Sequence, residues 1–283
     1  TYCGLVFLMS TRNGEPLALI NDGVLQHMRV GGGAGIGAKY LSRQDSEVVG
    51  MIGSGGMART FLDAFCCVRP IKECRVFSPT AGNKERFAEE MSEKLGIQVT
   101  PVSSPKDAII GADIVSTATD SMLPVYDADW LQPGQHVTNL GRREMPEEAV
   151  HRFDVVVRQG IAGLQMKQTD VFQAERGHSP AAFLGGTLKQ QRIIPDKNRS
   201  PGFGGDSPEF MDRGKGGDKP EFTDLVTGKC EGRTSSNQIT FYRNVGNQGL
   251  QFSSVGGLVY ELVLLQGLGR EIPTDWLLQD IRD

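Results

Sequence analysis

An apolar run leads into a glycine-rich turn in the segment Val48-Val49-Gly50-Met51-Ile52-Gly53-Ser54-Gly55-Gly56-Met57-Ala58. The turn has the pattern Gly-x-Gly-x-x-Ala, and residues 57–67 after it suit a helix. A strand, such a turn and a helix within a unit of about 30 residues are typical of a Rossmann unit that binds a dinucleotide. Gly53 allows the tight turn, Gly55 lets the backbone approach a pyrophosphate, and Ala58 lets the helix pack closely on the strand. We therefore expect the turn to bind NAD(P) through Gly53, Ser54, Gly55, Gly56 and Met57. The alternative is a glycine-rich turn in an α/β protein that holds no cofactor.

Strands and helices alternate after this turn. Apolar runs that suit strands occupy 73–77, 99–102, 113–117, 136–140 and 153–157, and helical patterns occupy 83–95 and 105–110. This alternation predicts an α/β fold with a Rossmann-type, doubly wound parallel sheet.

The segment before the turn predicts a hairpin and a glycine-rich helix. Two apolar runs, 4–9 and 16–20, flank Asn13-Gly14, which is a strong hairpin signal. Asp22 is placed to cap a helix over 23–42 that contains Gly31-Gly32-Gly33 and two further glycines. Each glycine costs a helix about 1 kcal/mol relative to alanine, so the run indicates either close packing against another backbone or a break in the helix.

The C-terminal half contains a stretch of different composition. Residues 189–222 are rich in glycine, proline and balanced charges, which favours a surface insertion or mobile loop. A strand over 238–242 and an apolar helix over 253–268 follow it. We expect a dinucleotide-binding domain at 45–175, a connection with the insertion at 176–234, and a smaller α+β substrate and dimerisation domain built from 1–44 and 235–283.

The choice between the two nicotinamide cofactors depends on the end of the strand 73–77. NAD enzymes usually place an acid there to bind the ribose hydroxyls, but this chain continues Ser78-Pro79-Thr80 and then Lys84 and Arg86. We therefore expect NADP(H), with Ser78, Thr80 and Lys84 near its 2′-phosphate; NAD(H) remains the second choice. The alternative is that Lys84 and Arg86 lie on a solvated helix face.

A second group of expected cofactor contacts follows the strand 113–117. Thr117-Ala118-Thr119 carries small and hydroxyl side chains at a carboxyl strand end, where such folds bind ligands, and leaves room for a nicotinamide ribose. A polar turn without a ligand is the alternative.

Composition excludes several other classes. The net charge of −4 is unlike that of a general nucleic-acid binder, and no apolar run approaches the length of a membrane span. The five cysteines form no C-x-x-C pair, which favours buried free thiols in a reducing cytoplasm. With four scattered histidines, we expect no metal site.

Several runs together resemble the ornithine cyclodeaminase/mu-crystallin family. They are Met28-Arg29-Val30, Ala38-Lys39-Tyr40-Leu41, the strand and turn 49–55, and Gly232-Arg233-Thr234-Ser235 with Ile239-Thr240-Phe241. The resemblance spans about residues 1–175 and 222–270. It implies a homodimer and a small-molecule substrate whose carboxylate Arg29 holds, a task that suits a bidentate guanidinium. Pairing of Arg29 with a local acid is the alternative. The resemblance also places the loop 244–247 near the nicotinamide, so we assign Val245 and Gly246 to the cofactor. We also assign Asn139, in the strand 136–140, to the cofactor.

Two departures from the family pattern bear on the activity. Cyclodeaminases carry an aspartate in a Gly-Gly-Asp or Gly-Ala-Asp motif after the strand 136–140, and this chain has Arg143 there, which either binds an acidic substrate group or points to solvent. Family members also have N-terminal elements with substrate-binding residues before the hairpin; either this sequence is a fragment or those segments are absent, so we assign no catalytic residue. We expect an NADP(H)-dependent oxidoreductase acting on an amino acid or imine. The alternatives are a cyclodeaminase-type lyase that uses bound NAD, and a non-catalytic dinucleotide-binding protein.

Overall fold

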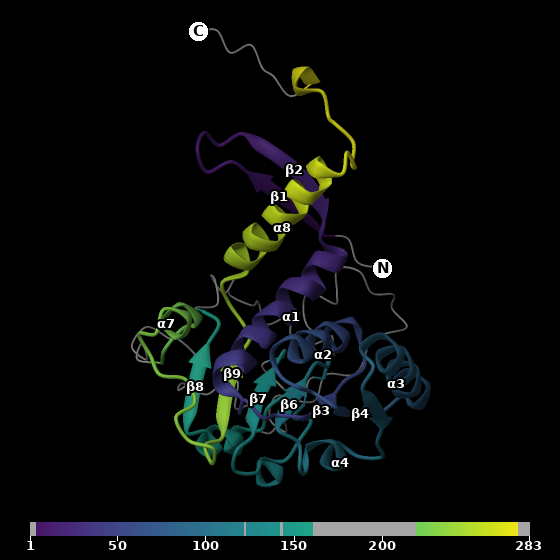
Figure 1. Ribbon diagram of the computed structural model, residues 1–283, viewed down its shortest axis with the longest axis vertical. Helices are drawn as coiled ribbons and strands as arrows, with labels where there is room; N and C mark the ends of the chain where they lie inside the picture. Colours follow the sequence, from purple (N-terminus) through teal and green to yellow (C-terminus); the bar gives the residue numbers. More distant parts are fainter. Residues whose placement is uncertain (1–3, 122, 142–143, 161–218, 277–283) are drawn as a thin grey trace, which may run out of the picture.

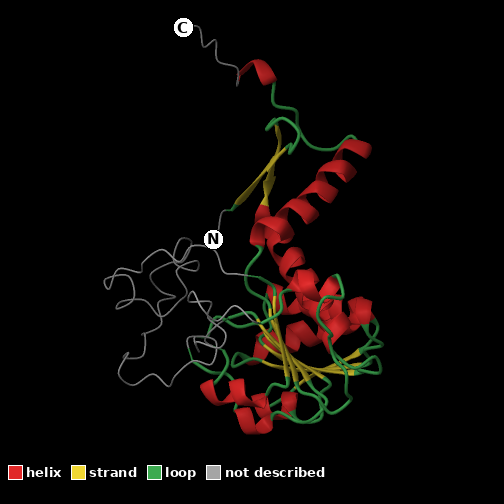
Figure 2. Cartoon of the chain, turned by 90° about the vertical axis from the view of Figure 1, so that its left-hand side faces the viewer, coloured by secondary structure: helices red, strands yellow, loops and turns green. Residues whose placement is uncertain are grey.

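The structure, a computed structural model, describes residues 4–121, 123–141, 144–160 and 219–276. Figures 1 and 2 show a body built on one large sheet, from which a hairpin and two helices extend. The sheet consists of seven short strands: β3 (Val48–Ile52), β4 (Glu73–Phe77), β5 (Gln98–Pro101), β6 (Ile114–Thr117), β7 (His136–Asn139), β8 (Val155–Arg158) and β9 (Thr240–Arg243). The helical segments of the body are α2 (Gly56–Val68), α3 (Ala81–Leu95), α4 (Pro105–Ile109), η1 (Ala128–Trp130), η2 (Glu147–Arg152) and α7 (Phe222–Val226).

All neighbouring strands of this sheet are parallel, in the order β5-β4-β3-β6-β7-β9-β8. The expected doubly wound parallel sheet is therefore confirmed. From β3 the chain builds β4 and β5 on one side and then β6 and β7 on the other, so the winding reverses between β3 and β6. Ligands of open α/β sheets bind at the carboxyl ends of the strands at such a switch point.

The two faces of the sheet carry separate hydrophobic cores. One core joins Val49, Met51 and Val76 to apolar side chains of α1, α2 and α3. The other joins Val115, Val137 and Phe241 to side chains of α4, η1 and η2. Because successive side chains of a strand point to opposite faces, strands buried on both faces read as continuous apolar runs, as these do.

The hairpin pairs β1 (Leu5–Met9) with β2 (Pro16–Asn21) in antiparallel register, as expected. It leads directly into α1 (Asp22–Leu41), and α8 (Gln248–Leu265) packs against both (Figure 1). The expected cap at Asp22 is wrong by one residue. Asn21 has the extended backbone of a cap and accepts a hydrogen bond from the Gly23 amide, whereas Asp22 already lies in the first helical turn.

Gly31, Gly35 and Gly37 of α1 serve close packing, whereas Gly32 is exposed, and the helix continues through them all for 20 residues. A Cβ atom at Gly31 would stand 2.6 Å from the carbonyl oxygen of Thr60 in α2, and one at Gly37 would stand 2.5 Å from the ring of Tyr242 in β9. Their absence lets α1 lie directly on α2 and on the sheet.

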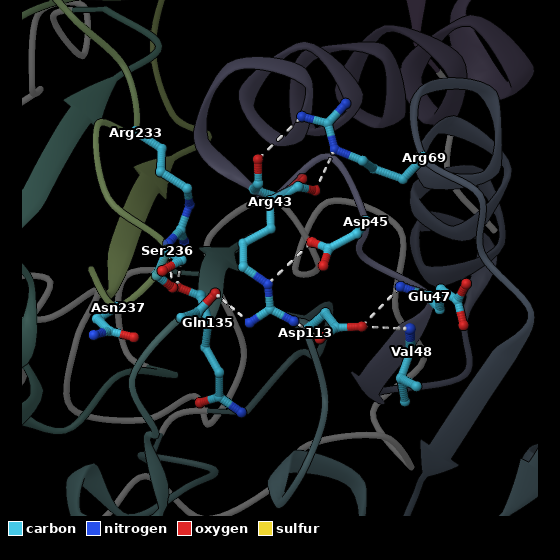
Figure 3. A network of polar contacts seen from close by, with 12 residues as sticks. Arg43, Asp45, Glu47, Val48, Arg69, Asp113, Gln135, Arg233, Ser236 and Asn237 are labelled. Atoms are coloured by element: carbon cyan, nitrogen blue, oxygen red, sulfur yellow. Dashed lines mark hydrogen bonds and ion pairs between the residues drawn. The ribbon is translucent and has the colours of Figure 1, made fainter.

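Arginines bind the carboxyl end of α1 (Figure 3). Arg69 donates to the carbonyl oxygens of Ala38, Lys39 and Ser42 at 3.1, 2.6 and 3.1 Å, and Arg233 donates to that of Leu41 at 2.7 Å. The last carbonyls of a helix lack intrahelical partners and carry partial negative charge, so guanidinium groups suit them. The network lies at the amino ends of the strands, opposite the edge where ligands are expected. Its arginines therefore fix α1 on the body.

The segment 235–283, which the sequence analysis grouped with the N-terminal region, contributes β9 to the large sheet between β7 and β8. The insertion 189–222 lies outside the described residues except for its last four. Of the described cysteines, all free, only Cys74 is buried, while Cys67 is exposed, so the expectation of buried thiols is wrong for Cys67. Among the described residues, no helix combines the length and apolarity needed to cross a membrane.

Candidate functional site

The glycine-rich turn joins β3 to α2 at the centre of the carboxyl edge. Gly53 has φ +108°, a conformation that favours glycine, and a Cβ atom there would stand 2.3 Å from the carbonyl oxygen of Ala118. Gly55 caps α2, and its side-chain position is open, with no atom within 4 Å. No side chain caps the first turn of α2, so its amide groups are available to an anion. This cradle fits the pyrophosphate of a dinucleotide.

Three of the predicted cofactor segments meet at Gly53. Its amide donates to the carbonyl oxygen of Phe77 at 2.8 Å, directly before Ser78, and its Cα side faces Ala118 and Thr119. The structure thus brings together the turn after β3, the end of β4 and the loop after β6, as expected for the switch point.

Two contacts of the turn were not foreseen. Arg59 Nη1 donates to the carbonyl oxygen of Ser54 at 2.6 Å, and its Nε donates to Glu90 of α3 at 2.9 Å. Arg59 therefore links the turn to α3. The imidazole of His27 in α1 lies over Gly56, where a Cβ atom would stand 2.4 Å from Cε1. Both side chains come from outside the motif, so the motif alone does not reveal them.

The residues expected near a 2′-phosphate lie at the end of β4 and the start of α3. Ser78 is buried and Thr80 is exposed at the cap of α3, where its side chain makes no capping hydrogen bond. Lys84 Nζ donates to the carbonyl oxygen of Val102 at 2.6 Å and lies 5.6 Å from the ring centre of Phe77. Lys84 is therefore half-buried, while Arg86 is exposed.

A buried carboxylate, that of Glu144, organises the loop after β6. It accepts hydrogen bonds from Thr117 Oγ1 at 2.9 Å, from the Thr119 amide at 2.5 Å, from Thr119 Oγ1 at 2.7 Å and from the Gly141 amide at 2.5 Å. Burial raises the pKa of Glu144 above its ordinary value, while these hydrogen bonds act in the opposite direction. Glu144 links the ends of β6 and β7 across residues that are far apart in sequence, so the expected contact residues Thr117 and Thr119 are fixed by a partner that the sequence analysis missed.

The remaining expected cofactor residues continue the same edge. Asn139, the last residue of β7, is buried and stands in register with Arg243, the last residue of β9. The loop after β9 begins at once: Val245 is half-buried, and Gly246 is buried with φ +106°. The loop then enters α8.

Arg29 lies in α1 beside the start of α8. It is 8% exposed, and its guanidinium donates to Gln26 Oε1 and, at 2.7 Å, to Gln251 Oε1. The guanidinium carbon lies 4.7 Å from the ring centre of Phe252. Arg143, the second expected substrate residue, lies outside the described residues. Among those described, no group of three His, Cys, Asp or Glu side chains is arranged to hold a metal ion.

Comparisons with known proteins agree with this geometry. The profile of the ornithine cyclodeaminase/mu-crystallin family matches residues 1–264. A putative dehydrogenase of Rhizobium meliloti is 37% identical over 186 residues, which are 64% of this chain and 55% of that protein. The chain therefore spans about half the length of this relative.

Two solved structures share the fold over most of the chain. One is Thermococcus litoralis Δ1-pyrroline-2-carboxylate reductase in complex with NADH and L-proline, at 28% identity and TM-score 0.73, covering 95% of this chain and 74% of that one. The other is an archaeal alanine dehydrogenase dimer with bound NAD, at 25% identity and TM-score 0.70, with the same two coverages.

Proposed function

Because the chain belongs to the ornithine cyclodeaminase/mu-crystallin family, we propose that it is an NAD(P)-dependent oxidoreductase that interconverts an α-amino acid and its imine. The observation that carries this proposal is the convergence of the turn after β3, the end of β4 and the loop after β6 around Gly53, with an open face at Gly55. The two solved relatives, a cyclic-imine reductase and an amino-acid dehydrogenase, support the same chemistry.

The chain's own residues would bind and orient the cofactor and the substrate. The amide groups of the first turn of α2 would hold the pyrophosphate, and the loop at Ala118 and Thr119, which Glu144 keeps in one shape, would hold the nicotinamide ribose. A bound nicotinamide cofactor supplies or accepts the hydride. Arg29 would bind the substrate carboxylate bidentately, with the ring of Phe252 against its guanidinium.

The variant Gly55→Val tests the cofactor site. The open space at Gly55 and its φ of −82° accept valine without strain, so the protein should fold, while the branched side chain blocks the approach of a pyrophosphate. We expect NAD(P)H affinity, followed by quenching or transfer of fluorescence, to fall about a hundredfold. Gly32→Val, on an exposed and equally open glycine of α1, is the control. Unchanged NADPH and NADH affinity in folded Gly55→Val would refute the proposal.

We also propose a preference for NADP(H). No acid follows β4 to bind the ribose hydroxyls or repel a 2′-phosphate, and Thr80 offers an uncommitted exposed hydroxyl there. Lys84 uses one of the three donors of its ammonium group on Val102, which leaves two donors for a phosphate. NADPH should bind more tightly than NADH, and Thr80→Ala or Lys84→Ala should narrow the difference. Lys94→Ala, at the other end of α3, is the control; a clear preference for NADH in the wild type would contradict this proposal.

The hairpin and α8 support a homodimer as a further proposal. Leu5, Phe7 and Met9 alternate along β1 and are 66%, 55% and 48% exposed, and Leu258 and Leu262 of α8 are 56% and 44% exposed. A two-stranded sheet with an exposed apolar face, next to an apolar helix, is unusual for an isolated surface. Light scattering should give twice the chain mass, and Phe7→Glu should shift the equilibrium to monomer. A monomeric wild type at assay concentration would contradict the proposal.

A further inference from the structure

The side chain of Gln251 connects α8 to Arg29, the residue proposed to hold the substrate carboxylate. Its Oε1 accepts from Arg29 Nη1 at 2.7 Å, and on the other side of the guanidinium Gln26 Oε1 accepts from Nη2 at 2.7 Å and from Nε at 3.1 Å. The ring of Phe252 supports the same guanidinium from one face. Two amide oxygens and one aromatic ring therefore set the plane in which Arg29 presents its donors.

The other end of the Gln251 side chain lies beside Gly33 of α1. Gly33 leaves a gap that three amide side chains share: a Cβ atom there would stand 2.7 Å from Asn244 Oδ1, 2.9 Å from Gln251 Nε2 and 3.1 Å from Gln159 Oε1. Asn244 donates through Nδ2 to the carbonyl oxygen of Val30 at 2.8 Å. The Oε1 of Gln251 thus accepts from the guanidinium, while its Nε2 lies on the side of Gly33, where Asn244 Oδ1 is a buried acceptor without a hydrogen-bond partner among the described residues.

We infer that Gln251 is a positioning residue that sets the carboxylate affinity of Arg29, and that its neutrality is the property that matters. This inference rests on the proposed function. An amide oxygen orients a guanidinium without a charge that competes with the ligand. A carboxylate in the same place would accept a charge-assisted hydrogen bond from Arg29, which is roughly twice as strong as a neutral one, and its charge would compete with the substrate for the guanidinium.

Two variants of Gln251 separate charge from positioning. Gln251→Glu keeps the shape and adds the charge, whereas Gln251→Leu removes the hydrogen bond. Gln248→Glu, on an exposed residue in the first turn of the same helix, is the control. The probes are Δ1-pyrroline-2-carboxylate as substrate, and L-proline as a ligand that protects the NADPH-loaded protein against thermal unfolding.

For Gln251→Glu we expect the KM for Δ1-pyrroline-2-carboxylate and the half-saturating concentration of L-proline to rise about tenfold, with kcat within about threefold and NADPH affinity unchanged. Gln251→Leu should weaken L-proline binding less, because no charge competes, and Gln248→Glu should match the wild type. Gln251→Glu with wild-type KM and wild-type protection by L-proline would overturn the inference alone. A wild type that binds neither NAD(P)H nor these carboxylates would instead overturn the proposed function on which the inference rests.

Discussion

The imidazole of His136 makes stability depend on pH in a direction that can be worked out. The side chain is fully buried at the start of β7, and burial, with Arg233 and Arg69 nearby, lowers its pKa from 6.5 to about 3. Thr240 Oγ1, 3.0 Å from Nδ1, donates its own proton to the carbonyl oxygen of Leu41 at 2.8 Å. Nδ1 of the neutral ring is therefore the donor in this contact.

Folding thus favours the neutral form of His136. Above the unfolded pKa of 6.5 both states hold the neutral ring, and the stability is full. As the pH falls below that value, the unfolded chain binds a proton at His136, whereas the folded chain does not bind it until the pH reaches about 3. The free energy of unfolding should therefore fall by about 1.4 kcal/mol per pH unit in this window, or about 2 kcal/mol between about pH 7 and about pH 5.

Urea unfolding of the wild type and of His136→Asn at these two pH values measures the effect. Asparagine retains an N–H donor for Thr240 but does not titrate, so the variant should lose about 2 kcal/mol less than the wild type on acidification, whatever its stability at neutral pH. His151→Asn, on the exposed side of η2, should keep the wild-type dependence. Equal losses in the wild type and His136→Asn would refute the reasoning.

Two further predictions concern packing and the loop after β6. Gly31→Ala should lower the free energy of unfolding by about 1–3 kcal/mol, since the added Cβ atom meets the backbone of Thr60. Gly32→Ala, at an exposed and open position, should raise the free energy of unfolding by about 1 kcal/mol. Urea unfolding that gives both variants the same stability would contradict the packing of α1 on α2. Glu144→Gln should lower the free energy of unfolding by about 1–3 kcal/mol and weaken NAD(P)H binding, because an amide NH2 group then faces N–H and O–H donors. Glu148→Gln, on an exposed residue, is the control. Equal cofactor affinity in the two variants would show that the loop does not depend on Glu144.

Local patterns predicted most of the secondary structure. The position of the turn at Gly53, between an apolar strand and a helix, predicted its role. The structure gives the physical reason for the glycine, since a positive φ and the close approach of Ala118 require it there. The strands of the parallel sheet, and the helices α2, α3 and α4 that cover it, begin and end within a few residues of the expected positions. By contrast, α8 begins at Gln248 rather than near Ser253, and η1, η2 and α7 were not expected. The family resemblance is confirmed over residues 1–264.

Features that depend on distant residues were not predictable. Nothing in residues 240–243 tells which strands they pair with, so the position of β9 between β7 and β8 appears only in the fold. The role of Glu144 could not be predicted, since its partners Thr117 and Thr119 become close only when β6 and β7 pair. For the same reason, the sequence left open whether the glycines of α1 break the helix or pack closely. The roles of Arg29, Arg143 and the other expected site residues remain predictions.

The proposed reduction of an imino acid is tested most directly by measuring the cofactor and the product in one sample. The wild-type protein is mixed with NADPH, and separately with NADH, and with Δ1-pyrroline-2-carboxylate; cofactor oxidation is read from near-ultraviolet absorbance and L-proline is quantified in the same sample. A parallel sample receives L-ornithine and NAD, and ammonia is measured. We expect the cofactor to be oxidised in an amount equal to that of the amino acid formed, and ornithine to release no ammonia. Ammonia release from ornithine without net change in the cofactor would contradict the proposed function, as would binding of NAD(P)H with no oxidation by this or any other imino acid.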